Sequence, residues 1–260
     1  MTRVQILAWN IQHGGGPDRT PEIALTIRAG MPDLVVLCEF RPTRGSMLRA
    51  AFADMGLDHH AVGAANHDLA NRVFIASRWP LERCSYVPDP ATARLLHVRT
   101  VGIDVIAAHI PDDSDLGARN DCWHRLLTLA RSCLDRPAII LGDFNAGRRG
   151  QDGRAFHGEA LLGTLTTLGF ADAWRHSRPN QREDTWVGSW GAARLDTAFL
   201  APPLIPRLVR CDYDHAPRLA GLSDHSAVML DLDWSCDPHA RNHPGLFNPP
   251  CLNDAERPSS

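Results

Sequence analysis

The 260-residue sequence contains no lysine, so all 27 of its basic side chains are arginines. Its formal net charge is −3, so no strong positive field surrounds the chain as a whole. A polyanion would therefore have to be held by a local patch of the surface. Each phosphate contact in such a patch would come from a planar guanidinium, which can donate two parallel hydrogen bonds.

Long apolar runs are also missing, and none is long enough to span a bilayer. The N-terminus, MTRVQILAWNIQ, lacks the charged segment and the following long apolar stretch of a signal peptide. The seven cysteines are odd in number and irregular in spacing, which favours reduced, buried thiols over a disulfide framework. We therefore expect a cytoplasmic protein without a membrane span, and we expect it to be a monomer.

Hydrophobic residues make up 44% of the sequence, enough for one large core or two small ones. No internal repeat or linker-like stretch occurs before residue 234, so we expect one domain over residues 1–234. Residues 235–260 are polar and rich in proline and asparagine, which is typical of a tail that is partly disordered or lies on the surface. The tail contains a C-x2-H-x3-H-x7-C spacing that could bind zinc but matches no standard finger.

Apolar runs with β-branched residues predict strands, and apolar residues at helical spacing predict helices. The longer strands are expected at residues 4–11, 33–38, 72–77, 101–110 and 138–141. Short strands are expected near residues 185–187, 195–200, 208–213 and 227–234. The helices are expected at residues 20–31, with Thr20 as the cap, and at residues 47–55, 115–135 and 161–168. The elements do not alternate strictly, which argues against a simple doubly wound sheet.

Polar side chains stand at the ends of apolar runs in this sequence. Five such sites end a run and a sixth opens one: WNIQ (9–12), CE (38–39), AHIP (108–111), GDFN (142–145), SDH (223–225) and RLD (194–196). Burying these groups is costly unless they are paired or bind a metal. Taken singly, Asn10 or Asp143 could hold a turn, and His109 could be an ordinary interior histidine. Together, the six sites indicate that strand ends converge on one polar pocket.

The ordered set WN, E, H, GDFN, RLD and SDH resembles the endonuclease/exonuclease/phosphatase superfamily, which includes exonuclease III-type and deoxyribonuclease-like metal-dependent phosphoesterases. The resemblance covers roughly residues 3–234, and NRVFIASRWPL (71–81) is similar to the family's strand that ends in Ser-Arg-x-Pro-Leu. It implies an α/β (α+β) fold, a four-layered α/β/β/α sandwich of two packed mixed β-sheets flanked by helices. The mixed order of the expected elements agrees with that architecture.

The resemblance also implies catalytic roles for individual residues. Asp143 would position or deprotonate the attacking water, and Asn145 would donate a hydrogen bond to the phosphoryl oxygens. His225 would contact the phosphate, with Asp196 as its carboxylate partner. His109 would complete the catalytic set. Deoxyribonuclease- and sphingomyelinase-like members have histidine at that position, whereas exonuclease III-type apurinic endonucleases usually have tyrosine.

The same resemblance implies a metal site. Glu39 matches the family's metal-binding glutamate, and Asn10 matches the asparagine that helps to hold the metal site. Asp224 matches an aspartate that binds the metal or a water near it, whereas Gln12 stands where several relatives have Asp or Asn. Oxygen ligands of this kind suit Mg²⁺ or Mn²⁺, so we expect one of these ions as cofactor.

Residues for substrate binding follow from two segments. Arg148 and Arg149 come directly after GDFN and could contact a nucleic-acid backbone or a polyphosphate group, although a solvated loop is an equal alternative. Residues 168–186 resemble the segment of exonuclease III-type enzymes that carries an aromatic pocket. The aromatic residues that could contact a sugar or base, unless they pack in the core, are Trp174, Trp186 and Trp190.

We therefore expect a divalent-metal-dependent phosphodiester hydrolase, and specifically a nuclease of the endonuclease or exonuclease type that acts on DNA, as in DNA repair. The alternative is a phosphatase or phosphodiesterase for a small-molecule or lipid-derived phosphoester, of the sphingomyelinase or inositol-phosphatase kind, which His109 and the acidic balance favour. A third hypothesis is a non-catalytic binding module with this fold. The complete set of residues for binding a metal and positioning a water argues against it. The GxSxG and P-loop motifs of other hydrolases are absent.

Overall fold

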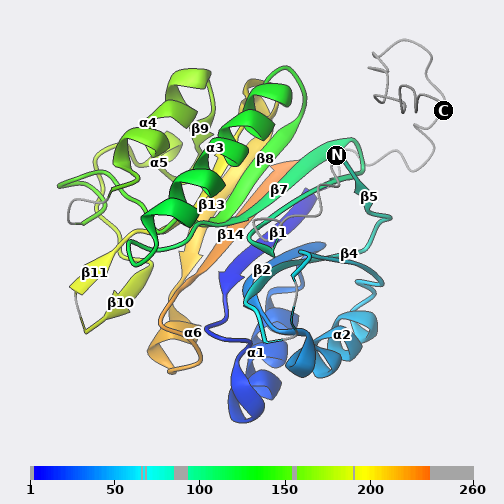
Figure 1. The fold of residues 1–260 in the computed structure, drawn as a ribbon. Coiled ribbons are helices and arrows are strands. Elements are labelled where there is room, and N and C mark those ends of the chain that lie inside the picture. The colour runs from blue at the N-terminus through cyan, green and yellow to red at the C-terminus, as the bar shows by residue number, and fades with distance from the viewer. Residues whose placement is uncertain are drawn as a thin grey trace, which may run out of the picture.

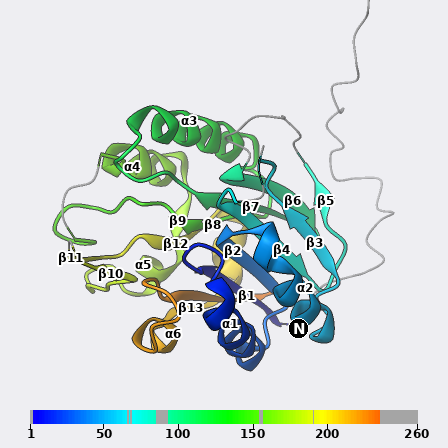
Figure 2. The same cartoon turned by 60° about the horizontal axis from the view of Figure 1, so that its bottom comes forward.

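The computed structural model describes residues 3–65, 67, 69–84, 93–153, 157–189 and 191–234. Two six-stranded mixed sheets pack face to face, with helices on the outer face of each (Figure 1). Figure 2 shows α3 and α4 on one side of the paired sheets, and α1 and α2 on the other. This is the predicted four-layer arrangement. No helix in these residues is long and apolar enough to cross a membrane.

The first sheet has the strand order β13-β14-β1-β2-β4-β3. Its strands are β1 (Arg3–Asn10), β2 (Leu34–Phe40), β3 (His59–Val62), β4 (Arg72–Ser77), β13 (Leu208–Asp214) and β14 (Ala227–Asp233). Strands β1 and β2 run parallel, and the other neighbours are antiparallel. Its outer face is covered by α1 (Gly16–Gly30) and α2 (Gly45–Asp54).

The second sheet has the order β5-β6-β7-β8-β12-β9. Its strands are β5 (Glu82–Arg83), β6 (Leu95–Thr100), β7 (Ile103–His109), β8 (Ala138–Asp143), β9 (Ala171–Asp172) and β12 (Asp196–Leu200). Strands β7 and β8 run parallel. Its outer face is covered by α3 (Leu116–Ser132) and α4 (Glu159–Leu168).

Shorter elements connect the strands. They are η1 (Pro42–Arg44), α5 (Ala173–Ser177), β10 (Trp186–Gly188), β11 (Gly191–Ala193), η3 (Pro202–Arg207) and α6 (Ala216–Leu219). Strands β10 and β11 form a separate two-stranded hairpin.

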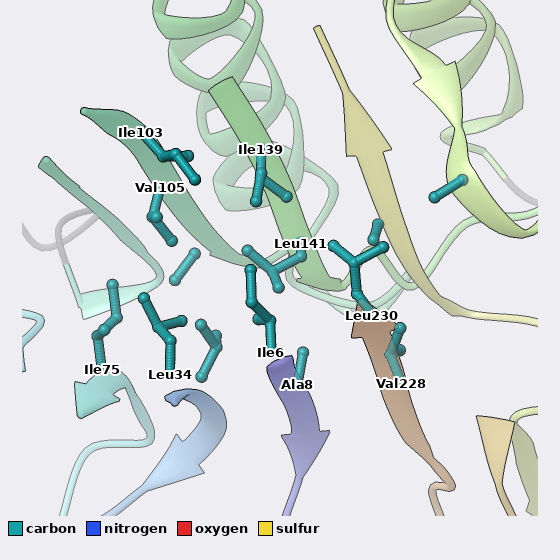
Figure 3. Close-up of a cluster of buried hydrophobic side chains, with 14 of the residues drawn as sticks. Ile6, Ala8, Leu34, Ile75, Ile103, Val105, Ile139, Leu141, Val228 and Leu230 are labelled. Atoms are coloured by element: carbon teal, nitrogen blue, oxygen red, sulfur yellow. The ribbon is translucent and has the colours of Figure 1, made fainter. Parts of the chain in front are cut away.

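The core lies between the two sheets and beneath the helices. Alternate residues of a central strand face different layers: Val36 of β2 joins the core between the sheets, whereas Val35 packs with the helices. Figure 3 shows Ile6 of the first sheet facing Leu141 of the second, and Leu34 facing Val105. Because both faces of these strands are covered, their sequences are mostly apolar, which is why they could be found as apolar runs.

The start of the first helix differs from the prediction. The helix begins at Gly16, with Pro17 in its first turn, and Thr20 lies inside it instead of capping it. The hydroxyl of Thr20 donates to the carbonyl of Gly16. The reason is the glycine triplet: Gly14 and Gly15 have φ of +73° and +75°, a left-handed conformation that glycine adopts without steric cost. The chain therefore reverses soon after β1 and the helix starts earlier.

Sequence patterns also missed β3, β5, β6, β9 and α5. Strand β6 contains His97 and Arg99 among apolar residues, which hid its strand character. Both side chains find a partner in Asp104 of β7: His97 Nε2 lies 2.8 Å and Arg99 Nη2 lies 3.3 Å from its carboxylate. A buried carboxylate on the neighbouring strand thus lets a polar-looking segment lie in the sheet.

The five described cysteines are free thiols, and all of them except Cys84 are buried, as their spacing predicted. Residues 235–260 lie outside the described residues, together with the predicted zinc-binding spacing. The division into a domain of residues 1–234 and a tail therefore stays a prediction.

A network of buried ion pairs joins β12 to the elements around it. Arg194 Nε lies 2.7 Å from Asp152 Oδ1, and Arg194 Nη2 lies 2.5 Å from Asp172 Oδ2. Arg194 Nη1 lies 3.1 Å from the hydroxyl of Tyr213, and Arg175 pairs with Asp152. The guanidinium of Arg194 is almost fully buried. The arginine of the RLD motif is therefore a structural anchor for the strand that Asp196 opens.

Candidate active site

Polar side chains from both sheets meet at one edge of the sandwich. Asn10 ends β1, and Glu39 lies one residue before the end of β2. His109 and Asp143 end the parallel strands β7 and β8, where they are paired in register. Asp196 opens the antiparallel strand β12 directly opposite Asp143. The carboxyl ends of two parallel strand pairs therefore converge, as the six polar sites indicated.

An open cavity of about 960 Å³ lies at this edge. The predicted site residues that line it are Asn10, Glu39, His109, Asp143, Asn145, Trp186, Asp224 and His225. Asp196 lies behind the wall, where its carboxylate contacts His225. The arginines that line the cavity in the described part of the chain are Arg94 and Arg125, which sequence reasoning did not single out.

The carboxylate of Asp143 is the centre of the arrangement. Its Oδ1 accepts a hydrogen bond of 2.9 Å from the backbone amide of Asn145, and its Oδ2 accepts one of 2.9 Å from Asn10 Nδ2. His109 Nε2 and His225 Nε2 each lie 3.8 Å from that Oδ2. Burial raises the pKa of the Asp143 carboxyl to about 7, because the His225 ring only partly offsets it. Near neutral pH this carboxylate can therefore accept a proton.

The glycine before Asp143 permits this placement. Gly142 has a φ of +137°, and a Cβ there would lie 2.0 Å from the carbonyl oxygen of Ala108 on β7. Only glycine allows β7 and β8 to approach so closely at their ends. Beyond Asp143, the side chain of Asn145 donates to the carbonyl of Ile110, and buried Arg119 donates to the carbonyl of Asn145. The GDFN loop is thus held by the residue that follows β7 and by α3.

His225 and Asp196 form a buried pair. His225 Nδ1 lies 2.9 Å from Asp196 Oδ2, which also accepts a bond of 2.6 Å from the Thr185 hydroxyl. Burial opposes a charged ring, but the Asp196 and Asp143 carboxylates outweigh it and raise the pKa of His225 to about 10. The ring is therefore cationic at neutral pH, with Nε2 facing the cavity. Ser223 fixes the loop by donating to the carbonyl of Asn10 at 2.6 Å.

His109 has the opposite electrostatic character. Its ring is buried, and Arg94 Nη1 lies 2.9 and 3.1 Å from the two ring nitrogens. Burial, together with the Arg94 and His225 cations, holds the pKa of His109 well below its usual range. The site therefore contains one cationic and one neutral imidazole, each 3.8 Å from Asp143 Oδ2.

An irregularity in the sheet aims Glu39 into the cavity. The pairing of β2 with β4 shifts register between Leu37 and Phe40, and Glu39 between them has a φ of +60°. Such a bulge re-aims a side chain at the end of a strand. Glu39 Oε2 accepts a bond of 2.7 Å from the backbone amide of His13, and Oε1 lies 3.4 Å from Asn10 Nδ2.

Three residues beside Glu39 were not found from sequence. The ring of His13 lies 2.9 Å from Glu39 Oε2, and Asn71 Nδ2 lies 3.1 Å from His13 Nδ1. Arg41 Nε donates to Asn71 Oδ1 at 2.7 Å. His13 follows WNIQ directly, and Asn71 opens the family-like NRVFIAS segment, so adjacency to those motifs was the available signal.

The donor set can hold a divalent cation. Asp143, Asp196 and His225 each offer a ligand atom, and these atoms lie within 4.8 Å of one another. Of these three, Asp196 and His225 are also paired with each other. The carboxylates that line the cavity next to Asn10 are those of Glu39 and Asp143, and Asn10 lies between them and donates to both. Oxygen donors of this kind fit a hard divalent cation.

The predicted substrate-binding residues are spread more widely. Trp186 lies at the cavity, where its indole nitrogen donates to Asp224 Oδ2 at 3.1 Å. Trp174 is buried against Tyr213, so it belongs to the core. Arg148 is half-buried and Arg149 is exposed, outside the cavity lining, and their contact with a substrate stays a prediction. Trp190 lies outside the described residues.

Solved structures with similar folds include an AP endonuclease from Archaeoglobus fulgidus, with 23% identity and a TM-score of 0.73. They also include a variant of the 3' phosphatase NExo from Neisseria bound to a product DNA hairpin, with 21% identity and a TM-score of 0.76. A third is the 3'-5' exonuclease NExo from Neisseria meningitidis, with 21% identity and a TM-score of 0.74. Each match covers 89% of this chain and 100% of the other.

A comparison with curated proteins finds no match. The model of the Endonuclease/Exonuclease/phosphatase family matches residues 7–225, which include every polar site that carried the resemblance. This chain therefore belongs to the endonuclease/exonuclease/phosphatase family, as its motifs predicted.

Proposed function

We propose that this protein is a divalent-metal-dependent phosphodiesterase that hydrolyses DNA at the cavity around Asp143. The observation that carries the proposal is the position of Asp143 Oδ2, held by Asn10 and facing both His109 and His225. A water at this carboxylate would lie beside the cationic imidazole of His225, which can donate a hydrogen bond to a phosphoryl oxygen. Phosphoryl transfer needs mainly such positioning and charge compensation.

Each residue then has a distinct task. Asp143 orients the attacking water and takes its proton, while Asn10 and Asn145 hold the carboxylate in place. His225, kept cationic by Asp196, contacts the phosphoryl oxygens through Nε2, and neutral His109 completes the wall opposite. Positive charge next to the phosphoryl group stabilises the transition state.

We assign Mg²⁺ or Mn²⁺ to the cavity beside Glu39. Glu39 would be its main carboxylate ligand, with Asn10 holding the site and Asp224 binding the ion or a water near it. When bound, the ion would polarise the phosphate and neutralise developing charge.

DNA as substrate is supported by two observations. Trp186 lies at the edge of the cavity, where an indole can stack on a base or sugar. The folds of the AP endonuclease and of NExo, the latter bound to a product DNA hairpin, are similar to this one. Outside the cavity, Arg148 and Arg149 would contact the phosphate backbone.

A second function is favoured by the acidic residues of the cavity lining. Besides Arg94 and Arg125, the lining includes Asp112, Asp113, Asp115 and Asp121. Aspartates at a groove repel each of the successive phosphates of a polyanion, so they disfavour it more than a substrate with a single phosphoester. Phosphodiester or monoester hydrolysis of a small or lipid-derived molecule is therefore the alternative.

The deciding experiment measures cleavage of a fluorescent duplex with one abasic-site analogue. An intact duplex, a single strand and bis-p-nitrophenyl phosphate are tested beside it, each with Mg²⁺, Mn²⁺ or EDTA. We expect incision of DNA with either metal and none with EDTA. Turnover of the small diester with every DNA substrate intact would refute the DNA proposal and support the alternative. The ratio of abasic to intact cleavage reports whether a repair role is tenable.

Glu39→Gln is expected to raise the Mg²⁺ concentration for half-maximal activity at least about tenfold, since changes around a metal site commonly cost that much affinity. The substitution removes the charge of the carboxylate but keeps its size. Titration of activity with Mg²⁺ measures the effect, and Glu22→Gln on the exposed face of α1 serves as the matched control. An unchanged Mg²⁺ requirement would remove Glu39 from the ligand set.

A further inference from the structure

A second cluster of ligating side chains lies on the outer side of the second sheet, away from the cavity. Cys84 follows the edge strand β5, and its backbone amide donates to the carbonyl of His97 on β6 at 3.2 Å. Asp104 lies near the start of β7, and Cys133 directly follows α3. Asp104 is five residues from His109 at the other end of β7, about 17 Å along an extended strand.

The ligand atoms of Cys84, His97 and Asp104 lie within 4.8 Å of one another, and Cys133 lies beside this group. Cys84 Sγ lies 3.8 Å from Asp104 Oδ1, and Asp104 Oδ1 lies 2.8 Å from His97 Nε2. Cys133 Sγ lies 3.9 Å from the same His97 nitrogen. Atoms that bind one tetrahedral zinc ion lie about 3.3–3.8 Å apart, given ordinary Zn–S and Zn–N distances. The distance between Cys84 and Asp104 already fits, the Cys133 thiol would move slightly closer, and the His97–Asp104 hydrogen bond would open slightly.

The surroundings suit an ion bound by this ligand set. Two thiolates and one carboxylate carry one more negative charge than a zinc ion neutralises. Arg136 Nη2 donates to Cys133 Sγ at 3.2 Å, and Arg136 Nη1 lies 3.5 Å from Asp104 Oδ2. Arg99 Nη2 lies 3.3 Å from the same carboxylate. These guanidinium groups offset the excess charge and orient the ligands, as outer-sphere partners do in metal sites.

We propose that Cys84, His97, Asp104 and Cys133 form a structural zinc site, distinct from the catalytic cavity. Thiolate and imidazole donors select zinc over the hard ions that suit the catalytic carboxylates. His97, Asp104 and Cys133 are buried, whereas Cys84 is exposed and gives the ion access from solvent. The ion would tie the end of the two-residue edge strand β5, which pairs with β6, to β7 and to the end of α3 as well.

The test is the zinc content of the full-length protein, purified without chelator and measured by mass spectrometry of the metal. The wild type is expected to carry one zinc per chain at this site, and Cys84→Ala is expected to lose it. Replacement with Co²⁺ should produce a thiolate-to-cobalt charge-transfer absorption that is also lost in Cys84→Ala. Because Cys84 is exposed, its replacement does not open the core. Arg136→Gln should weaken zinc binding by about 10–100-fold, measured by chelator competition.

Three controls separate this site from others. Cys211→Ala changes a buried thiol outside the cluster and should keep its zinc. Glu39→Gln should keep it too, because that change alters only the catalytic cavity. Cys236→Ala tests the cysteine–histidine spacing after residue 234. Absence of zinc from the wild type, or zinc that survives in Cys84→Ala and is lost in Cys236→Ala, would overturn the proposal.

Discussion

Asp143→Asn is expected to lower kcat for phosphodiester hydrolysis on the order of 10³-fold, the scale on which a positioned general base contributes. The amide cannot take a proton from water. Its NH₂ group would also replace one of the two carboxylate oxygens, which now accept hydrogen bonds from Asn10 and Asn145. Burial, which raises the pKa of Asp143 to about 7, also means that the folded state tolerates a neutral group at this position. We therefore expect a large loss of activity with little loss of stability.

The measurement is single-turnover hydrolysis of bis-p-nitrophenyl phosphate at saturating Mg²⁺, with thermal unfolding as the check on the fold. Asp54→Asn, at the exposed end of α2, is the matched control and should behave as the wild type. His225→Ala in the same assay should lose activity to a similar extent, because the cation beside the phosphate is removed. Near-normal rates in Asp143→Asn would rule out this carboxylate as the base.

Arg194→Met is expected to lower the free energy of unfolding by about 3–5 kcal/mol, the usual cost of breaking a buried ion pair from one side. Methionine fills much of the volume but leaves the carboxylates of Asp152 and Asp172 buried without the cation between them. Chemical denaturation measures the change. Arg207→Met, on an exposed arginine of η3, should change stability by less than about 0.5 kcal/mol. Equal stabilities of the two variants would contradict the role assigned to the network.

The same network makes the free energy of unfolding depend on pH in the acidic range. Burial alone would raise the pKa of Asp152, but the Arg194 guanidinium outweighs it and holds that pKa below its ordinary value. The unfolded carboxyl titrates near pH 3.9, so its contribution is complete above about that pH and is lost as pH falls through the folded value. In Arg194→Met the part of this contribution that comes from Arg194 is lost, while Arg175 still pairs with Asp152, so the difference from wild type should shrink on acidification.

Local sequence was sufficient to predict the elements in which apolar residues follow one another along the chain. Strands β1, β2, β7 and β8 are covered on both faces, so their burial can be predicted from their apolar residues. Elements that are stabilised by a distant partner could not be predicted in this way. Strand β6 contains His97 and Arg99, and only Asp104 on the next strand accounts for them.

The sequence by itself determined the family and, through that resemblance, the order of the layers and the motif residues that meet around Asp143, because the motifs and their order can be recognised without knowledge of contacts. Only the tertiary structure decided how those residues differ in charge and orientation. His109 and His225 are the same residue type, yet Arg94 and burial make one neutral while Asp196 makes the other cationic. The anchoring by Arg194, the bulge at Glu39 and the cluster around His97 likewise depend on groups far apart in the chain. Electrostatic and packing energies act through space, so a linear pattern cannot specify them.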